Sequence, residues 1–214
     1  MTQVIAVLNQ KGGVGKTTLT SNLGEAFKRS GLSVLLVDSD PQGSLRDWNE
    51  ASEGEVLPVV GLDRETLAKD LDAIKTQYDI VLIDGAPQSG RLAAAAIKSA
   101  QLVLIPVTPS PYDVWACSDL VEALKARQMI TDGKPAARFL ISRARKNTRL
   151  SGDLAEALSG YEIPTLKSGT VHREAYAQTA ADGLTVFHAK GAGEAVAEIE
   201  AIKAEVMEIL KNGI

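Results

Sequence analysis

Short runs of apolar residues alternate with longer amphipathic stretches along the whole chain. The apolar runs are rich in Val, Ile and Leu without polar alternation, as expected of parallel strands that are covered on both faces. We expect strands at residues 3–8, 33–38, 79–84, 101–106 and 137–142, with weaker candidates at 56–60 and 162–166. The stretches between them predict helices at 16–30, 64–76, 89–100, 113–128, 149–158, 173–182 and 192–211. This rhythm predicts an α/β fold with a doubly wound, mostly parallel sheet flanked by helices.

The last predicted helix carries apolar residues at helical spacing over 194–210, with glutamates on its other faces. A helix that lies on a membrane surface needs Lys and Arg on its polar face to meet anionic lipid. The acidic face therefore favours a helix that is docked on the core or on a dimer partner.

Composition narrows the class of protein. With 214 residues, 45% hydrophobic and 23% charged, the chain suits one globular domain over 1–214. A net charge of −4 excludes a surface that is positive all over, but it permits a local basic patch. Cys117 is the single cysteine, so no internal disulfide can form, which fits the reducing cytoplasm. No apolar run approaches the roughly 18 residues that span a bilayer, and no signal peptide is recognisable.

A glycine-rich segment, Lys-Gly-Gly-Val-Gly-Lys-Thr-Thr, follows the first predicted strand directly. A strand that runs through such a loop into a helix forms a phosphate site, because backbone N–H groups turn inward at a helix N-terminus. The end of the segment matches the P-loop pattern G-x-x-x-x-G-K-[ST], although Gln10 stands where the first glycine is expected. The expected nucleotide-binding residues are Lys11, Gly12, Gly13, Val14, Gly15, Lys16, Thr17 and Thr18.

The residue types in this loop favour a nucleoside triphosphate. Lys16 is expected to reach the β- and γ-phosphates, Thr17 to coordinate Mg²⁺, and Thr18 to bind the α-phosphate. The main rival is a dinucleotide site, since Gly13 begins a G-x-G-x-x-G pattern. That pattern needs glycine at position 18, and a dinucleotide site has no use for the Lys-Thr pair.

Acidic residues end two of the predicted strands. Asp38 and Asp40 follow one apolar strand and stand before a proline, and Asp84 ends another strand in the Walker B manner. Carboxylates at this edge of a parallel sheet face the crevice in which ligands bind. Asp38 and Asp84 are therefore candidate ligands of Mg²⁺, together with Thr17. Asp40 is a candidate for holding an attacking water.

Taken together, the second P-loop lysine, the 38–42 segment and the Asp84 strand resemble the ParA/MinD group of deviant-Walker ATPases. The proline-rich segment 106–111, which is followed by Asp113, and the tail around 173–176 and 186–187 look like small ParA proteins of the ParF type. The resemblance covers essentially the whole chain. It implies the P-loop NTPase fold, ATP and Mg²⁺ as cofactors, and a homodimer that encloses two ATP molecules. It also implies that Lys11, Lys16 and Asp40 are the catalytic set, with Lys11 reaching the partner's nucleotide and Asp40 positioning the water.

The function implied is a partition ATPase with a slow basal rate. It would dimerise on ATP, bind DNA without sequence preference, and release it when a ParB- or ParG-like centromere-binding protein stimulates hydrolysis.

Alternatives are the same switch acting on a protein assembly, or a MinD-like ATPase on a membrane, which the acidic C-terminal helix disfavours. An iron–sulfur reductase needs more cysteines than this chain has. A scaffold without turnover is disfavoured because Lys16, Thr17, Asp40 and Asp84 are all present. Because the first strand begins by Gln3, no N-terminal DNA-reading domain is expected.

Candidate DNA contacts come from the densest basic stretch, residues 134–149, and from basic residues that follow it. Lysine and arginine on one surface can neutralise DNA phosphates without reading bases. No aromatic-rich groove accompanies them, so single-strand recognition is not expected. The predicted DNA contacts are Arg145, Lys146, Arg149, Lys167 and Arg173.

Overall fold

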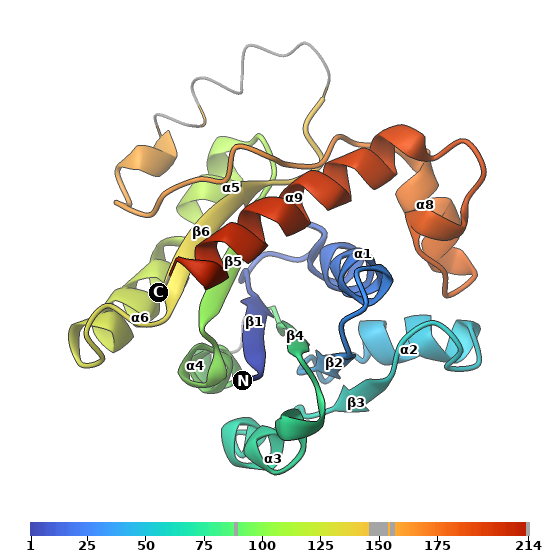
Figure 1. Cartoon of the computed structure of the whole chain (residues 1–214). Coiled ribbons are helices and arrows are strands. Elements are labelled where there is room, and N and C mark those ends of the chain that lie inside the picture. Colours follow the sequence, from blue (N-terminus) through green and yellow to red (C-terminus); the bar gives the residue numbers. More distant parts are fainter. Residues whose placement is uncertain (88–89, 146–153, 155–156, 213–214) are drawn as a thin grey trace.

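In the computed structural model, six parallel strands form one sheet with the order β3-β2-β4-β1-β5-β6 (Figure 1). The structure describes all residues except 88–89, 146–153, 155–156 and 213–214. The strands are β1 (Gln3–Val7), β2 (Val34–Asp38), β3 (Val59–Gly61), β4 (Ile80–Asp84), β5 (Leu102–Val107) and β6 (Ala136–Ile141). The strand order reverses direction at β1, as in a doubly wound sheet, so the predicted fold class is confirmed.

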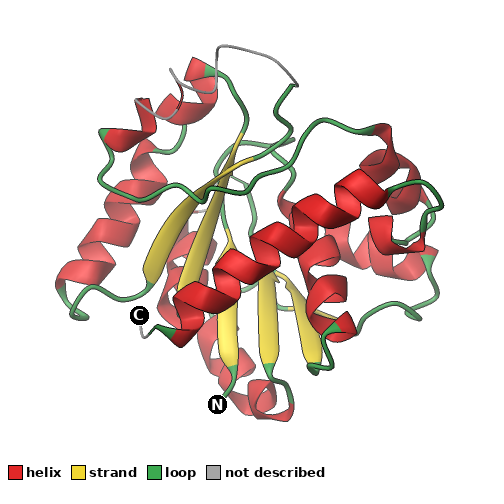
Figure 2. Ribbon diagram, turned by 45° about the horizontal axis from the view of Figure 1, so that its top comes forward, coloured by secondary structure: helices red, strands yellow, loops and turns green. Residues whose placement is uncertain are grey.

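Helices connect the strands and cover both faces of the sheet (Figures 1 and 2). The α-helices described are α1 (Lys16–Arg29), α2 (Ser44–Ala51), α3 (Leu67–Ile74), α4 (Gly90–Ser99), α5 (Pro111–Trp115), α6 (Ser118–Met129), α8 (Glu174–Ala181) and α9 (Gly193–Lys211). Two short 3₁₀ helices, η1 (Lys75–Gln77) and η2 (Val186–His188), complete them.

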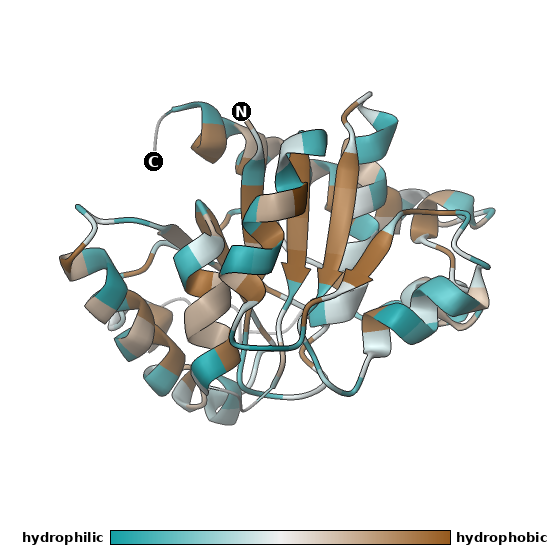
Figure 3. Ribbon diagram, turned by 90° about the horizontal axis from the view of Figure 1, so that it is seen from below, coloured by the Kyte–Doolittle hydropathy of each residue, from teal (hydrophilic) through white to brown (hydrophobic). Residues whose placement is uncertain are grey.

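Successive strand residues enter two different cores, because side chains alternate across a sheet. Val4 and Ala6 pack with residues of α3, α4 and α6 on one face. Ile5 and Val7 pack with residues of α1, α2 and α9 on the other. All five residues of β4 are buried, and the strands are correspondingly apolar along their length (Figure 3). Burial on both faces explains why the sequence shows runs of Val, Ile and Leu rather than alternation.

The last long helix, α9, lies across one face of the sheet and packs against α1 (Figure 2). Its buried residues Ile199, Ile202 and Val206 belong to the same core as Leu23 and Phe27 of α1. The expectation of a helix docked on the core is therefore confirmed. Over the described residues, no helix combines the length and the apolar character that crossing a membrane requires.

Three expectations about elements differ from the structure. Residues 44–51 form α2, which the apolar pattern did not predict. The helix expected at 113–128 is two helices, α5 and α6, that meet at buried Cys117. The weak strand expected at 162–166 was wrong: only Thr165 forms an isolated bridge, and Pro164 has no N–H to offer a ladder. Most of the helix expected at 149–158 lies outside the described residues.

Truncating Ile202 to Ala should destabilise the protein by about 2–5 kcal/mol, because it leaves a cavity between α9 and α1. Ile202 is fully buried there, whereas Lys211 of the same helix is exposed. Urea unfolding followed by circular dichroism measures the effect, with Lys211→Ala as the control. Equal midpoints for the two variants would show that α9 does not stabilise the core.

Candidate nucleotide site

Strands β1, β2 and β4 end at the same edge of the sheet, and the predicted site lies at this edge. In the strand register, Val7 of β1 and Asp38 of β2 both pair with Asp84 of β4. The P-loop leaves the sheet from β1, so its helix begins directly above the two buried acids. The register of the sheet thereby joins segments that lie up to 77 residues apart in the chain (7 against 84).

The P-loop has the backbone conformation that its glycines permit. Gly13 and Gly15 have φ values of 79° and 91°, in the left-handed region that residues with a Cβ rarely adopt. A Cβ on Gly15 would also lie 3.0 Å from the Ser142 side-chain oxygen. The loop ends at Lys16, the first residue of α1, whose Nζ donates to the Lys11 carbonyl oxygen at 3.0 Å. The loop is thus closed on itself around the site for phosphate.

Lys16 is buried, and burial lowers the pKa of its ammonium, while the charges of Asp84 and Asp40 act in the opposite direction. Burial is also the largest cause that raises the pKa of Asp84, to about 7. The hydrogen bond from Thr17 lowers that pKa, and the nearby charge of Asp38 raises it again. The buried carboxyl group of Asp84, which accepts a hydrogen bond from Thr17, therefore has a pKa raised toward neutral pH.

Thr17 and Asp84 fit the predicted magnesium site. The Thr17 hydroxyl donates to one carboxylate oxygen of Asp84 at 2.6 Å. The other oxygen, Oδ1, is buried and has no hydrogen-bond partner. An unpartnered buried carboxylate oxygen is costly, and a cation would satisfy it. Mg²⁺ is commonly held by one or two protein groups plus substrate phosphates, which is the set that these two residues offer.

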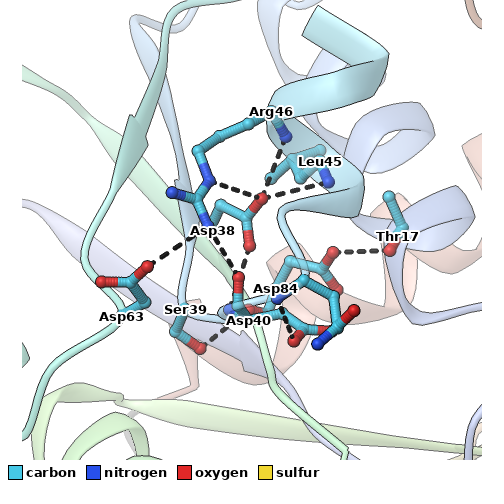
Figure 4. A network of polar contacts seen from close by, with 9 residues as sticks. Thr17, Asp38, Ser39, Asp40, Leu45, Arg46, Asp63 and Asp84 are labelled. Carbon is cyan, nitrogen blue, oxygen red and sulfur yellow. Dashed lines mark hydrogen bonds and ion pairs between the residues drawn. The ribbon is translucent and has the colours of Figure 1, made fainter.

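Asp38, the last residue of β2, and Asp40, in the loop that follows, belong to one hydrogen-bonded network (Figure 4). Asp38 is fully buried: its Oδ1 accepts from the Asp40 N–H, and its Oδ2 accepts from the N–H groups of Leu45 and Arg46. These bonds favour a role for Asp38 in anchoring α2 over direct metal ligation, which stays a prediction. Asp40 is half-buried and lines the nucleotide cavity, where a water-holding carboxylate is expected.

Lys11 does not line this cavity. Its ammonium forms an ion pair with Asp113 of α5, which is buried and also accepts from the Thr108 hydroxyl. Lys11 and Asp113 line a neighbouring pocket together with Arg143 and Arg145. Sequence reasoning gave Asp113 no role, because nothing in the pattern shows which cation a distant aspartate will meet.

The cavity extends from the P-loop toward α8, with a volume of about 510 Å³. Its far end is formed by Ser142, the 170–173 segment and Tyr176, none of which the motifs had indicated as ligands. Arg143 joins the two ends, since its guanidinium donates to the Gly13 carbonyl at 2.6 Å. The size and polarity of this extension suit a nucleoside beyond the phosphates.

In the described part of the chain, the predicted DNA-binding residues do not gather on one surface. Lys146 and Arg149 lie outside the described part of the chain. Lys167 is exposed, and Arg145 lines the pocket beside Lys11. Arg173 is paired with Glu194 and Glu198 of α9 and lines the nucleotide cavity, so part of its charge is already neutralised.

A parallel α/β sheet with a glycine-rich loop between β1 and α1, and a Thr–Asp pair suited to a metal ion at its edge, are the features of a P-loop nucleotide-binding protein. The family model for the CobQ/CobB/MinD/ParA nucleotide binding domain matches residues 5–186. The chain therefore belongs to this family.

Several relatives match nearly the whole chain. The chain is 28% identical to the maintenance of carboxysome distribution protein A of Halothiobacillus neapolitanus, with 95% of each chain covered. It is 32% identical to the protein of the same name from Gloeobacter kilaueensis, with 95% of this chain and 94% of the relative covered. It is 27% identical to protein ParA of Rhizobium radiobacter (98% and 96%).

Solved structures agree on the fold. An ATP complex of a Cyanothece McdA variant matches with a TM-score of 0.76 at 17% identity (96% of each chain). The septum site-determining protein MinD of Pyrococcus horikoshii, complexed with Mg-ADP, matches with 0.73 at 18% identity (98% of each chain). One of these neighbours binds ATP and the other binds Mg-ADP, in agreement with the predicted cofactors.

Mg²⁺-dependent binding of ATP should tighten about tenfold when the pH is raised from about 6 to about 8. Asp84 has a raised pKa of about 7, so it must lose its proton to hold the cation, and it is mostly ionised only above that pH. Calorimetry with ATP, in magnesium and in EDTA, measures the difference. Asp84→Asn should abolish the pH dependence, and the same dependence in that variant would assign it to another group.

Proposed function

We propose that this protein is an ATPase that dimerises on ATP and uses hydrolysis as a switch to position a cargo inside the cell. The observation that carries the proposal is that the two P-loop lysines have different positions. Lys16 is buried in the nucleotide cavity, whereas Lys11 is turned out of it and is held by Asp113. A lysine placed in this way is available to the nucleotide of a second copy.

Within one subunit, the described residues supply most of what hydrolysis needs. The P-loop amides and Lys16 bind the phosphates, and Thr17 and Asp84 hold Mg²⁺. Asp40 orients a water whose oxygen attacks the γ-phosphorus, and the bond from that phosphorus to the bridging oxygen breaks. Magnesium supplies positive charge to the phosphate oxygens when it is bound.

Lys11 of the second subunit would supply a further positive charge to the γ-phosphate. In other nucleotidases a donated cation of this kind contributes roughly 10³–10⁵ in rate. Turnover by the protein alone is therefore slow, and a partner that completes the site accelerates it.

A protein assembly is the favoured cargo. Both carboxysome-distribution relatives align with about the whole chain, at 28% and 32% identity. The second candidate cargo is a replicon, supported by the ParA relative of similar coverage. In either case the ATP dimer would bind DNA without sequence preference, through exposed basic residues such as Lys167 and the predicted basic stretch.

Asp40→Ala should bind Mg-ATP and accumulate as a dimer, because it loses the group that orients the water but none that holds the phosphates. Size exclusion with light scattering measures the dimer, and phosphate release measures turnover. Asp47→Ala is the matched control, since Asp47 is an exposed acid of the adjoining helix.

Lys11→Ala, in the same assays, should remain monomeric and lose turnover while it keeps its affinity for ATP. A monomeric Asp40→Ala variant at saturating Mg-ATP would refute the ATP-dependent dimer. Loss of ATP affinity in Lys11→Ala would make Lys11 a ligand of its own subunit's nucleotide.

The two cargoes are separated by a plasmid-retention test. An otherwise unstable plasmid receives the gene with its flanking DNA, and a copy with Lys16→Ala serves as the inactive control. If the cargo is a protein assembly, both plasmids should be lost at the same rate per generation. Slower loss with the active gene would favour replicon partition.

A further inference from the structure

Arg46, near the start of α2, connects three segments around the nucleotide site (Figure 4). Its Nη2 donates to the Asp40 carbonyl oxygen at 2.9 Å and to the Asp63 carboxylate at 3.3 Å. Its Nε lies 3.4 Å from the Asp38 carboxylate, which also accepts from the Arg46 backbone N–H. One side chain thus ties the loop after β2 to the loop after β3 and to the start of α2.

The space around this side chain is shaped by two glycines. A Cβ at Gly43 would lie 3.3 Å from the Arg46 guanidinium, and a Cβ at Gly61 would lie 3.2 Å from it. Both distances are closer than ordinary packing. The guanidinium therefore lies in a slot between the two loops, and its planar fork suits several acceptors at fixed angles.

The negative charges around Arg46 also favour this position of its guanidinium. Asp38 is fully buried, and burial together with the nearby charges of Asp38 and Asp40 raises the pKa of Asp84. Arg46 is the cation that meets Asp38 and Asp63 in the described network. Burial of a carboxylate is costly unless it has hydrogen bonds and a paired charge, and Arg46 gives Asp38 one of each.

The contact with Asp40 is made through its backbone. Arg46 binds the Asp40 carbonyl oxygen, while the Asp40 carboxylate accepts from the Gln42 N–H at 2.9 Å and lines the cavity. Arg46 therefore fixes where the Asp40 side chain starts without occupying the oxygens that would hold water.

We propose that Arg46 is a positioning residue for hydrolysis, which acts by holding the loop of Asp40 at a fixed place above the sheet edge. The inference rests on the proposed function, in which Asp40 orients the attacking water. The geometry of a reacting water is demanding, and displacements of about 1 Å can cost on the order of 100-fold in rate. Arg46 is not expected to contribute to ATP affinity, because the nucleotide cavity is lined by other residues.

The test compares Arg46→Met, Arg46→Lys and Asp63→Asn with the wild-type chain in Mg-ATP. Turnover should fall by about 10- to 100-fold in Arg46→Met, with Mg-ATP affinity within about twofold of wild type. Arg46→Lys keeps a charge near Asp38 but has no fork, so its turnover should be intermediate. Asp63→Asn weakens one of the three contacts of the Arg46 side chain and should show the smallest loss of turnover. Arg91→Met is the matched control, since Arg91 forms an exposed pair with Glu65.

The outcomes separate this inference from the proposed function. Wild-type turnover in Arg46→Met would overturn the positioning role. A parallel fall of Mg-ATP affinity and turnover in all three variants would also overturn it, because a merely structural role predicts that result. A wild-type chain that releases no phosphate would instead remove the proposed function, and the inference with it.

Discussion

The site depends on the register of three parallel strands. Because β1, β2 and β4 end at the same level, Asp38 and Asp84 lie side by side under the P-loop. Each carboxylate is buried and each has a different partner: Asp38 has the start of α2 and Arg46, and Asp84 has Thr17. A slip of one residue would exchange the two faces of a strand and separate both pairs. The apolar packing on the two faces of the sheet therefore also sets the positions of the polar groups.

Sequence patterns predicted the strands and the long helices well, because both depend on local periodicity. They also indicated Lys16, Thr17 and Asp84 as site candidates, since a P-loop and a Walker B strand leave local signatures, and the fold brings these three residues close together. Helix α2 was missed because it is short and offers only two buried apolar residues, Leu45 and Trp48. Its N-terminal N–H groups are satisfied by Asp38, which precedes Leu45 by seven residues. Contacts such as Lys11–Asp113 and Arg46–Asp63 depend on tertiary structure, and no spacing rule in the chain reports them.

Two lysines of one loop thus have opposite environments. Lys16 is surrounded by the loop itself and faces acids across the cavity. Lys11 is partly exposed at the side, with an aspartate as its present partner. An ammonium group that leaves a carboxylate must find an anion of comparable strength, and a triphosphate is one. Under the proposed function, the ion pair with Asp113 opposes dimer formation without nucleotide, and transfer of the Lys11 ammonium from this carboxylate to a triphosphate gives ATP control over the dimer.

The packing of α9 against α1 has a consequence for the newly made protein. The helix that begins at the phosphate loop has its outer side covered by a segment that follows every described strand in chain order. While the polypeptide is still emerging from the ribosome, Leu23 and Phe27 lack that cover. The loop and its helix are translated among the first residues but reach their final packing among the last. Complete burial of Leu23 and Phe27 therefore requires α9, which is among the last described segments to be translated.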